Sequence, residues 1–479
     1  MSRTRRLSLS IAGDKPREYC GVLAVYDPTG HAPQLAHRGL AALQHRGQEA
    51  AGLITVDAKG ELHALRGRGL VRQVLPGERI AALSGTLALG HVRYSTVPED
   101  HPENLQPLLG LTPYGALAIA HNGNLKNARA LTESLTSSGA VLATTMDTEL
   151  FLHLLARSGE STFAPALRRA AEAVVGAYCL ALFHDGKLYG LRDPFGLRPL
   201  VLGQLPGTPS GWVIASESCA LQTIGAKLIG EIARGELVEI GPRGVHRQQL
   251  LAPSPQPAPC VFELVYFARP DSVVFGQSVQ KARLEMGREL ARQDADLPTP
   301  DLVIPVPDSG VAAAVGYSHQ SGIPFDMAIL RSHFVGRSFL LPSQQERCQA
   351  LASKLSVISE SVTGKRVVLV DDSLVRGNTA RLIVQRVRER GAKEVWLRLA
   401  SPPIAWPCYL GIDMTTEEEL LYRRCQVQAK QSSLSPTALE LLRTQIGADS
   451  LRYLTMEGLR RASHNASFCF GCMTGEYPL

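Results

Sequence analysis

The sequence predicts two domains of different class, an α+β sandwich followed by an α/β domain with a parallel sheet. Before residue 251 the predicted strands are short, and helical stretches are segregated between runs of strands. After residue 260 continuous apolar strands alternate with amphipathic helices, as is typical of buried parallel sheets. The segment 251–260 between them has four prolines in seven positions, which favours an extended connector. We therefore place the domain boundary there.

The composition excludes several classes of protein. The chain has 479 residues, 45% hydrophobic and 20% charged, so disorder is not its dominant state. No run approaches the ~20 apolar residues that span a bilayer. The net charge of +6 is dispersed; it does not demand nucleic acid and suits a small anionic substrate. Nine cysteines in a long chain without an apolar signal segment lead us to expect a cytoplasmic protein with reduced thiols.

Hydrophobic periodicity predicts the elements in chain order. In the first domain, strands are expected at 21–26, 52–56, 87–92, 116–121, 178–184 and 212–215, and helices at 33–48, 147–158 and 162–175. In the second domain, strands are expected at 302–306, 366–370 and 394–400, and helices at 310–321 and 379–390. The stretch 331–354 has basic groups but no clean period, so we expect a long functional loop there.

The strongest local motif is VVLVDDSLVRGNT, residues 367–379. An apolar strand delivers Asp371 and Asp372 to its carboxyl end, where open α/β sheets bind ligands. The loop that follows leads into a helix whose N-terminus favours a phosphate. Carboxylates beside a phosphate suggest ribose hydroxyls or a hydrated Mg²⁺. The plainer alternative is an acidic strand end with a helix cap.

This motif resembles the phosphoribosyl pyrophosphate (PRPP) site of type I phosphoribosyltransferases, and VIPVPDSGVAAA at 303–314 agrees with it. The resemblance implies a 5-phosphate on the 373–379 loop, ribose hydroxyls at the two aspartates, and Mg²⁺ near Ser309, Asp371 and Asp372. The full implied PRPP set is Asp308, Ser309, Gly310, Arg331, Lys354, Asp371, Asp372, Ser373, Arg376, Gly377, Asn378 and Thr379. Asn378 stands where the family frequently has Thr. We expect the loop to tolerate this change, because its backbone N–H groups bind the phosphate.

Cys20 heads the first predicted strand and is followed by the patches HRGQEAAG, GHVRYST, AHNGNL and MDTE. A lone cysteine there is usually core, and HNGN alone is often a turn. Together they resemble the class II glutamine amidotransferases, which have an αββα N-terminal nucleophile fold. The resemblance implies that residues 1–19 are a propeptide. Its removal would free an α-amino group, with a pKa near ~8, as the base for the Cys20 thiol. It assigns Asn122 and Gly123 to the oxyanion hole, Arg93 to the glutamine α-carboxylate and Asp147 to the α-ammonium.

Both halves together resemble the iron–sulfur branch of the glutamine PRPP amidotransferase family. The resemblance implies transfer of ammonia from glutamine to PRPP at the start of purine synthesis. It also implies feedback inhibition by purine nucleotides, a homotetramer, domains at 20–250 and 261–462, and a tail at 463–479. Residues 266–271 are expected to line an ammonia passage. The resemblance assigns Cys260, Cys408, Cys469 and Cys472 to a structural [4Fe–4S] cluster, with zinc or no metal as alternatives.

Three rival functions fit less of the sequence. A PRPP-sensing DNA-binding regulator would need a recognition helix or a basic stripe, neither of which the sequence indicates. Other glutamine amidotransferases lack the 367–379 motif. A penicillin-acylase-like hydrolase would leave the second half unexplained.

Overall fold

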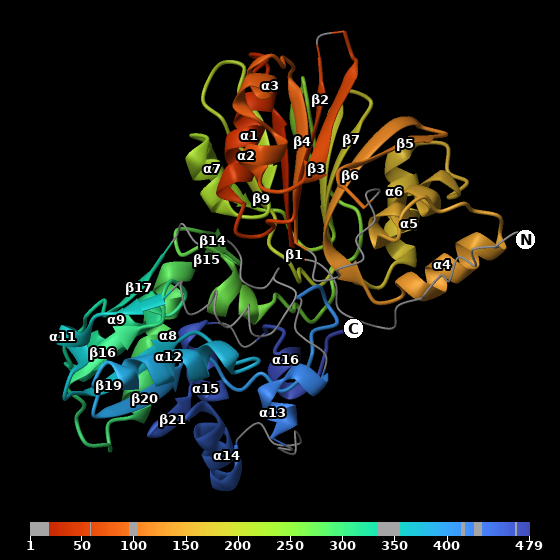
Figure 1. Cartoon of the computed structure of the whole chain (residues 1–479). Helices are drawn as coiled ribbons and strands as arrows, with labels where there is room; N and C mark the ends of the chain where they lie inside the picture. The colour runs from red at the N-terminus through yellow and green to blue at the C-terminus, as the bar shows by residue number, and fades with distance from the viewer. Residues whose placement is uncertain are drawn as a thin grey trace, which may run out of the picture.

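The computed structural model describes residues 19–57, 59–94, 104–332, 355–412, 417–425, 434–464 and 467–479. A sandwich of two sheets forms the upper part of Figure 1, and a smaller sheet with helices forms the lower part in green and blue. Among the described residues, none of the helices combines the length and apolar character that crossing a bilayer requires.

The first domain stacks a seven-stranded sheet on a six-stranded sheet. The first sheet has the order β11-β9-β10-β1-β4-β2-β3: β11 (Lys227–Glu231), β9 (Val201–Gln204), β10 (Trp212–Ala215), β1 (Tyr19–Tyr26), β4 (Leu87–Tyr94), β2 (Ala50–Val56) and β3 (Leu62–Arg68). The second has the order β13-β12-β8-β7-β6-β5: β13 (Gly244–Gln249), β12 (Glu236–Gly241), β8 (Lys187–Arg192), β7 (Gly176–His184), β6 (Gly115–Leu125) and β5 (Leu108–Thr112).

Helices cover the outer face of each sheet. Four helices pack on the first sheet: α1 (Ala32–Ala42), α2 (Val71–Val74), α3 (Gly77–Ala81) and α7 (Ser218–Thr223). On the side of the second sheet lie α4 (Ala128–Ser137), α5 (Asp147–Ala156) and α6 (Phe163–Ala173). A separate apolar layer fills the space between the sheets. The predicted αββα sandwich is therefore confirmed.

The helix expected at 33–48 is shorter than predicted, because α1 ends at Ala42. The apolar period continues past this point, but Gly47 lies directly against β4. A Cβ atom at Gly47 would come within 2.5 Å of the Arg93 amide nitrogen, so the chain turns to bring its backbone flat against that strand. This turn also carries Arg46 into the interior.

The second domain has a four-stranded parallel sheet in the order β16-β19-β20-β21. Its first three strands are those that the sequence predicts, and β21 was not predicted. Its strands are β16 (Leu302–Pro305), β19 (Arg366–Asp371), β20 (Glu394–Leu399) and β21 (Ser450–Tyr453). One face packs on α8 (Val279–Gln293), α9 (Val311–Ser321) and α15 (Met456–Ala462), and the other on α12 (Asn378–Glu389) and α14 (Pro436–Ile446). The parallel α/β class is confirmed.

Short elements complete this domain. They are the π-helical turn η1 (Glu263–Phe267), the hairpin β14 (Val273–Val274) and β15 (Gln277–Ser278), the pair β17 (Ile329–Arg331) and β18 (Leu355–Val357), α11 (Ser359–Val362), η3 (Glu417–Glu419), α13 (Leu421–Arg424) and α16 (Gly471–Thr474). The proline-rich segment lies along the first domain, where Cys260 N–H donates to the Leu197 carbonyl at 3.1 Å. The tail returns to the same domain, because Lys126 Nζ donates to the Leu479 carbonyl at 2.7 Å.

Candidate active sites

Strand register brings the first predicted site together between the two sheets. Cys20 pairs directly with Arg93 across β1 and β4, so both side chains lie on one face of the sheet. Alternation puts Cys20 on the face of Val22 and Ala24, and Asn122 on the face of Ala118 and Ala120; these four neighbours form part of the layer between the sheets. Cys20 and Asn122 therefore face the same interior layer from opposite sheets.

Both predicted oxyanion residues are tightly enclosed. Asn122 is 1% exposed, and its Nδ2 has no hydrogen-bond partner within the described structure. A buried amide without a partner is costly, so a ligand oxygen would satisfy it. Gly123 approaches β7 so closely that a Cβ atom would lie 1.9 Å from the Ala177 carbonyl oxygen. Only glycine fits this position.

Asp147 begins α5 and lies beside the same strand. Its Oδ2 accepts from the Leu125 N–H at 2.9 Å, and Oδ1 is 3.3 Å from His121 Nδ1. Burial raises the pKa of Asp147, but His121 and the Leu125 amide lower it by more than burial raises it. The pKa of Asp147 therefore lies below the ordinary value. An anionic Asp147 suits an ammonium ligand. On the other side, Arg93 is 5% exposed and donates to the Asn104 carbonyl.

A buried ionic cluster behind Cys20 was not among the predicted site residues. Arg46 Nε donates to the Cys20 carbonyl at 3.0 Å, and the guanidinium also bonds to Glu217 and Glu263. Arg46 lies in the HRGQEAAG patch, and Glu263 stands alone in an otherwise apolar run, CVFELVYF. An isolated charge in an apolar run is the signal that could have marked Glu263, although its partner is 217 positions away.

The second predicted site lies where β16 and β19 end side by side. These strands are parallel neighbours, with Pro305 opposite Val370, so their following loops meet at one edge. Gly310 fits against this edge: a Cβ atom there would lie 2.3 Å from the Val370 carbonyl oxygen and 3.2 Å from the Asp371 Cα atom. The loop containing Asp308, Ser309 and Gly310 is thereby held beside the paired aspartates.

The paired aspartates are buried and close together. Asp371 is 8% and Asp372 5% exposed, and the Asp372 N–H donates to Asp371 Oδ1 at 2.9 Å. Burial raises the pKa of Asp371 well above the ordinary value, and the neighbouring Asp372 carboxylate adds to this effect. The two carboxylates, with the Ser309 hydroxyl hydrogen-bonded to Asp371, are the oxygen donors that Mg²⁺ prefers, so these residues could hold that ion.

The loop after the aspartates is open to solvent at the start of α12. Arg376, Asn378 and Thr379 are exposed, Ser373 and Gly377 are partly exposed, and Gly377 adopts φ +81° before the helix begins. Ser373 Oγ donates to Asp372. Arg331 at the end of β17 donates to Asp308 Oδ2 at 2.8 Å. Lys354 and most of the expected long loop lie outside the described residues.

The four cysteines assigned to a cluster come from three separate segments that meet. Cys260 and Cys469 form a parallel bridge, and the Cys472 carbonyl accepts from Ala405 and Trp406 just before Cys408. Burial and the neighbouring thiols raise the pKa of Cys260 and of Cys472, which places these sulfurs within electrostatic reach of one another. No three of the four sulfur atoms, all of them described, lie within 4.8 Å of one another.

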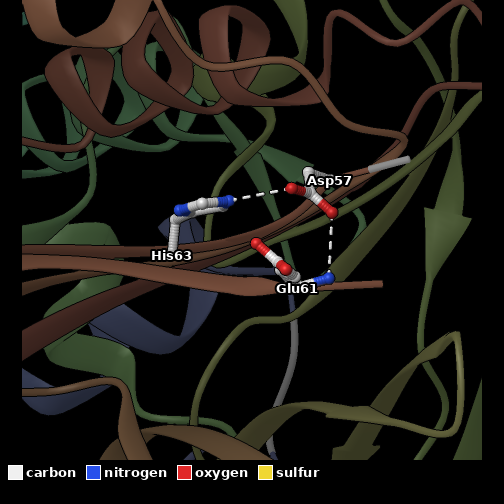
Figure 2. A group of neighbouring side chains, drawn as sticks. All are labelled: Asp57, Glu61 and His63. Carbon is white, nitrogen blue, oxygen red and sulfur yellow. Dashed lines mark hydrogen bonds and ion pairs between the residues drawn. The ribbon is translucent and has the colours of Figure 1, made fainter. Parts of the chain in front are cut away.

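A further group of potential metal ligands, Asp57, Glu61 and His63, lies at the turn between β2 and β3 (Figure 2). Asp57 already accepts from the Lys59 and Glu61 amides, both at 2.9 Å, and bonds to His63 Nε2 at 3.1 Å. These bonds account for the grouping as a stabilised surface turn.

Comparison with known proteins finds relatives of both domains. A family model described as "Glutamine amidotransferase domain" matches residues 91–223, and one described as "Phosphoribosyl transferase domain" matches residues 280–399. The chain is 43% identical over 470 residues to amidophosphoribosyltransferase 1, chloroplastic, of Arabidopsis thaliana, covering 97% of this chain and 80% of the relative. It is 42% identical to the amidophosphoribosyltransferase of Archaeoglobus fulgidus, covering 96% and 98%.

Solved structures match over almost the whole chain. Glutamine PRPP amidotransferase from B. subtilis, complexed with ADP and GMP, superimposes with a TM-score of 0.86 at 39% identity, covering 96% of this chain and 97% of that one. A structure titled as the allosteric regulatory enzyme of purine biosynthesis gives a TM-score of 0.87 at 39% identity, covering 96% of each chain.

Proposed function

Because this chain belongs to the amidophosphoribosyltransferase family, we propose that Cys20 releases ammonia from glutamine and that the Asp371 loop presents PRPP to it. The chain is a transferase that moves ammonia from glutamine to PRPP, giving 5-phosphoribosylamine, pyrophosphate and glutamate, at the first step of purine synthesis. The observation that supports the residue roles best is that Cys20, which pairs with Arg93 across β1 and β4, faces the same interior layer as Asn122, whose amide nitrogen has no hydrogen-bond partner among the described residues.

In the first site, removal of residues 1–19 gives Cys20 a free α-amino group, which takes the thiol proton. The thiolate attacks the side-chain amide carbon of glutamine, whose carboxylate and ammonium bind Arg93 and Asp147. The Asn122 amide and the Gly123 N–H stabilise the oxyanion. When the intermediate collapses, the C–N bond breaks while the leaving amide nitrogen takes the proton from the α-ammonium, so that ammonia departs and the thioester remains. Water then hydrolyses the thioester to glutamate and restores the thiol.

In the second site, the 373–379 loop binds the 5-phosphate and the paired aspartates bind the ribose hydroxyls. Asp308, Ser309 and Gly310 hold the pyrophosphate, with Arg331 and Lys354 closing over it. Ser309, Asp371 and Asp372 would hold Mg²⁺, which supplies positive charge to the leaving pyrophosphate. Ammonia displaces pyrophosphate at C1 with inversion. Because water would compete at C1, the chain must exclude it during transfer, and residues 266–271 line the passage between the sites.

Four further features belong to this proposal. The donor set of Cys260, Cys408, Cys469 and Cys472 suits a structural [4Fe–4S] cluster, which joins linker, body and tail. No three of the four described sulfur atoms lie within 4.8 Å of one another, which favours a cluster over a single zinc ion, because four Zn–S bonds of about 2.3 Å would hold the sulfurs closer together. A reducing cytoplasm would keep these thiols available. We also propose a homotetramer and inhibition by purine nucleotides, since the B. subtilis relative was solved with ADP and GMP.

The decisive experiment is Cys20→Ala assayed with two nitrogen sources. Synthesis of phosphoribosylamine from glutamine should be abolished, while synthesis from added ammonium should persist. Loss of both activities in a folded variant contradicts the two-site scheme. Native mass spectrometry of the wild-type chain tests the other features, because it reports whether Cys20 is the N-terminus, how many subunits assemble, and whether iron and sulfide are bound. Inhibition by added ADP and GMP tests the regulation.

A further inference from the structure

The surroundings of Arg46, directly behind Cys20, are shared between the two domains. Arg46 is fully buried, and its Nε holds the Cys20 carbonyl at 3.0 Å. Glu263, in the first turn of the second domain, accepts from both terminal nitrogens of Arg46, at 2.8 and 3.0 Å. The ring of Phe267 in the same turn lies 4.4 Å from the guanidinium carbon. The second domain therefore supplies two of the groups that orient this arginine.

The charges explain why this orientation is fixed. Burial lowers the pKa of Arg46, but Glu263 and Glu217 raise it above the ordinary value, so Arg46 stays cationic. The guanidinium of a buried arginine stays in one orientation only while the carboxylates that accept its hydrogen bonds stay in place. Neutralising Glu263 would leave Glu217 as the one carboxylate bonded to Arg46. It would also weaken the two parallel hydrogen bonds that orient the guanidinium so that Nε donates to the Cys20 carbonyl.

The opposite side of the glutamine site is also supported from the second domain. Asn124, one residue beyond the oxyanion glycine, donates from Nδ2 to the Tyr409 carbonyl at 2.9 Å. Gly411 packs on the same strand: a Cβ atom there would lie 3.0 Å from the Gly123 carbonyl carbon and 3.2 Å from the Asn124 amide nitrogen. The 409–411 loop thus fixes the backbone that presents the Gly123 N–H.

One buried arginine connects these two supports. Arg198 donates through Nη1 to Glu263 Oε1 at 3.2 Å and through Nη2 to the Leu410 carbonyl at 2.9 Å. It is 2% exposed, so both bonds are shielded from water. Displacing the 409–411 loop would therefore disturb Glu263 as well.

We infer that Glu263 and the 409–411 loop are positioning residues for glutamine hydrolysis, contributed by the second domain to a site that lies in the first. The inference rests on the proposed role of Cys20 as nucleophile. Glu263 holds the nucleophile strand through Arg46, and the loop holds the oxyanion strand through Asn124 and Gly411. Glutamine hydrolysis then requires a correctly seated second domain, whereas synthesis from ammonium does not require these contacts.

The first test compares Gly411→Ala with Gly322→Ala. Both glycines adopt positive φ, +91° and +74°, but a Cβ atom at Gly322 meets nothing within 4 Å. Gly411→Ala should lower kcat/KM for glutamine by about ten- to hundredfold, through kcat, because small displacements at a reacting centre cost this much. Ammonium-dependent synthesis should remain. Equal behaviour of the two variants with glutamine would overturn the inference.

The second test compares Glu263→Gln with Glu289→Gln. Glu289 is also a buried acid of the second domain in ion pairs, with Arg292 and Arg461, but it has no bond to Arg46 or Arg198 among the described contacts. Only Glu263→Gln should slow glutamine hydrolysis and the alkylation of Cys20 by an electrophilic glutamine analogue. Equal loss with glutamine and with ammonium in a folded protein would refute a positioning role.

These outcomes can be separated from failure of the proposed function. If Cys20→Ala retains glutamine-dependent synthesis, Cys20 is not the nucleophile and the premise fails. If Cys20→Ala behaves as expected but Gly411→Ala matches Gly322→Ala, the inference alone fails. If Glu263→Gln does not fold, the Gly411→Ala comparison decides.

Discussion

The two sites differ in how complete they are before a ligand binds. In the glutamine site, the residues proposed to do the chemistry are enclosed: Cys20 is fully buried, Asn122 is 1% exposed and Arg93 5%. In the PRPP site, the side chains of Asp308 and Arg331 are 62% and 46% exposed, and the phosphate loop faces solvent. The residues of the first site are enclosed between the two sheets, while the second site is an open edge with two buried carboxylates.

The difference follows from the charge that each ligand brings. Glutamine is a zwitterion, so its site can be built from groups already balanced within the protein, such as Asp147 beside His121. PRPP is highly anionic and is proposed to bind with Mg²⁺, and its site places two carboxylates, Asp371 and Asp372, side by side. Burial and then the adjacent Asp372 carboxylate raise the pKa of Asp371 well above the ordinary value. Preorganisation is therefore concentrated in the first site, and ligand-driven completion in the second.

Removing the unpartnered amide of the first site should have the largest effect. Asn122→Ala should reduce kcat with glutamine by about 10²–10³-fold, because one preformed oxyanion donor is lost. The KM for glutamine should change little, since Arg93 and Asp147 still bind the substrate. Steady-state kinetics with glutamine and with ammonium measure the two effects separately.

The matched control is Asn127→Ala, just beyond the same strand, whose amide nitrogen already donates to the Ala173 carbonyl at 3.0 Å. If Asn122→Ala and Asn127→Ala reduce kcat equally, the activity of the first site does not depend on a preformed donor at Asn122.

The sequence predicted well those residues whose place depends on a single strand end. Asp371 and Asp372 follow an apolar run, and a parallel strand brings its following loop to the ligand-binding edge whatever the rest of the chain does. Both the sandwich and the parallel sheet could be predicted for the same reason, because the pattern of apolar residues within each element is a local property.

The residues that local patterns could not predict are those fixed by distant partners. Glu263 meets Arg46 across 217 positions, and Arg198 meets Leu410 across 212. Neither pairing has a periodic signature, since each depends on how the domains dock. The overextended helix has the same cause, because Gly47 leaves the helical path to lie against Arg93.

An intermediate effect is expected from Asp371→Asn in the open site. This variant should be more stable than the wild type at neutral pH but less active. The folded pKa of Asp371 lies above its unfolded value, near the ordinary ~3.9 for Asp, so the folded protein binds the proton more tightly. The free energy of unfolding of the wild type should then fall as the pH rises from about 4 through the raised pKa of Asp371 in the folded protein. The variant has no such proton to lose and should have the higher Tm at neutral pH without ligand.

The same variant should use PRPP poorly with either nitrogen source, and Mg²⁺ with PRPP should no longer raise its Tm. Thermal melts at several pH values, with and without Mg²⁺ and PRPP, make both measurements. A wild type whose Tm does not fall between pH 5 and pH 8 relative to Asp371→Asn would show that the open site carries no charge imbalance.

The smallest effect is expected at the exposed edge, from Arg331→Ala. An exposed ion pair such as Arg331–Asp308 contributes only about 0–1 kcal/mol, so the free energy of unfolding should hardly change. Without Arg331, however, the Asp308 carboxylate would face the incoming pyrophosphate unscreened. The KM for PRPP should therefore rise by roughly fivefold, equivalent to about 1 kcal/mol, and kcat should stay nearly constant.

Arg129→Ala, which removes an exposed pair with Glu133 in α4 of the first domain, is the control. Because the repulsion acts between exposed groups, it should shrink as salt is added, which a merely structural role would not predict. A rise in KM that does not depend on salt would mean that Arg331 shapes the loop around Asp308 and does not screen its charge.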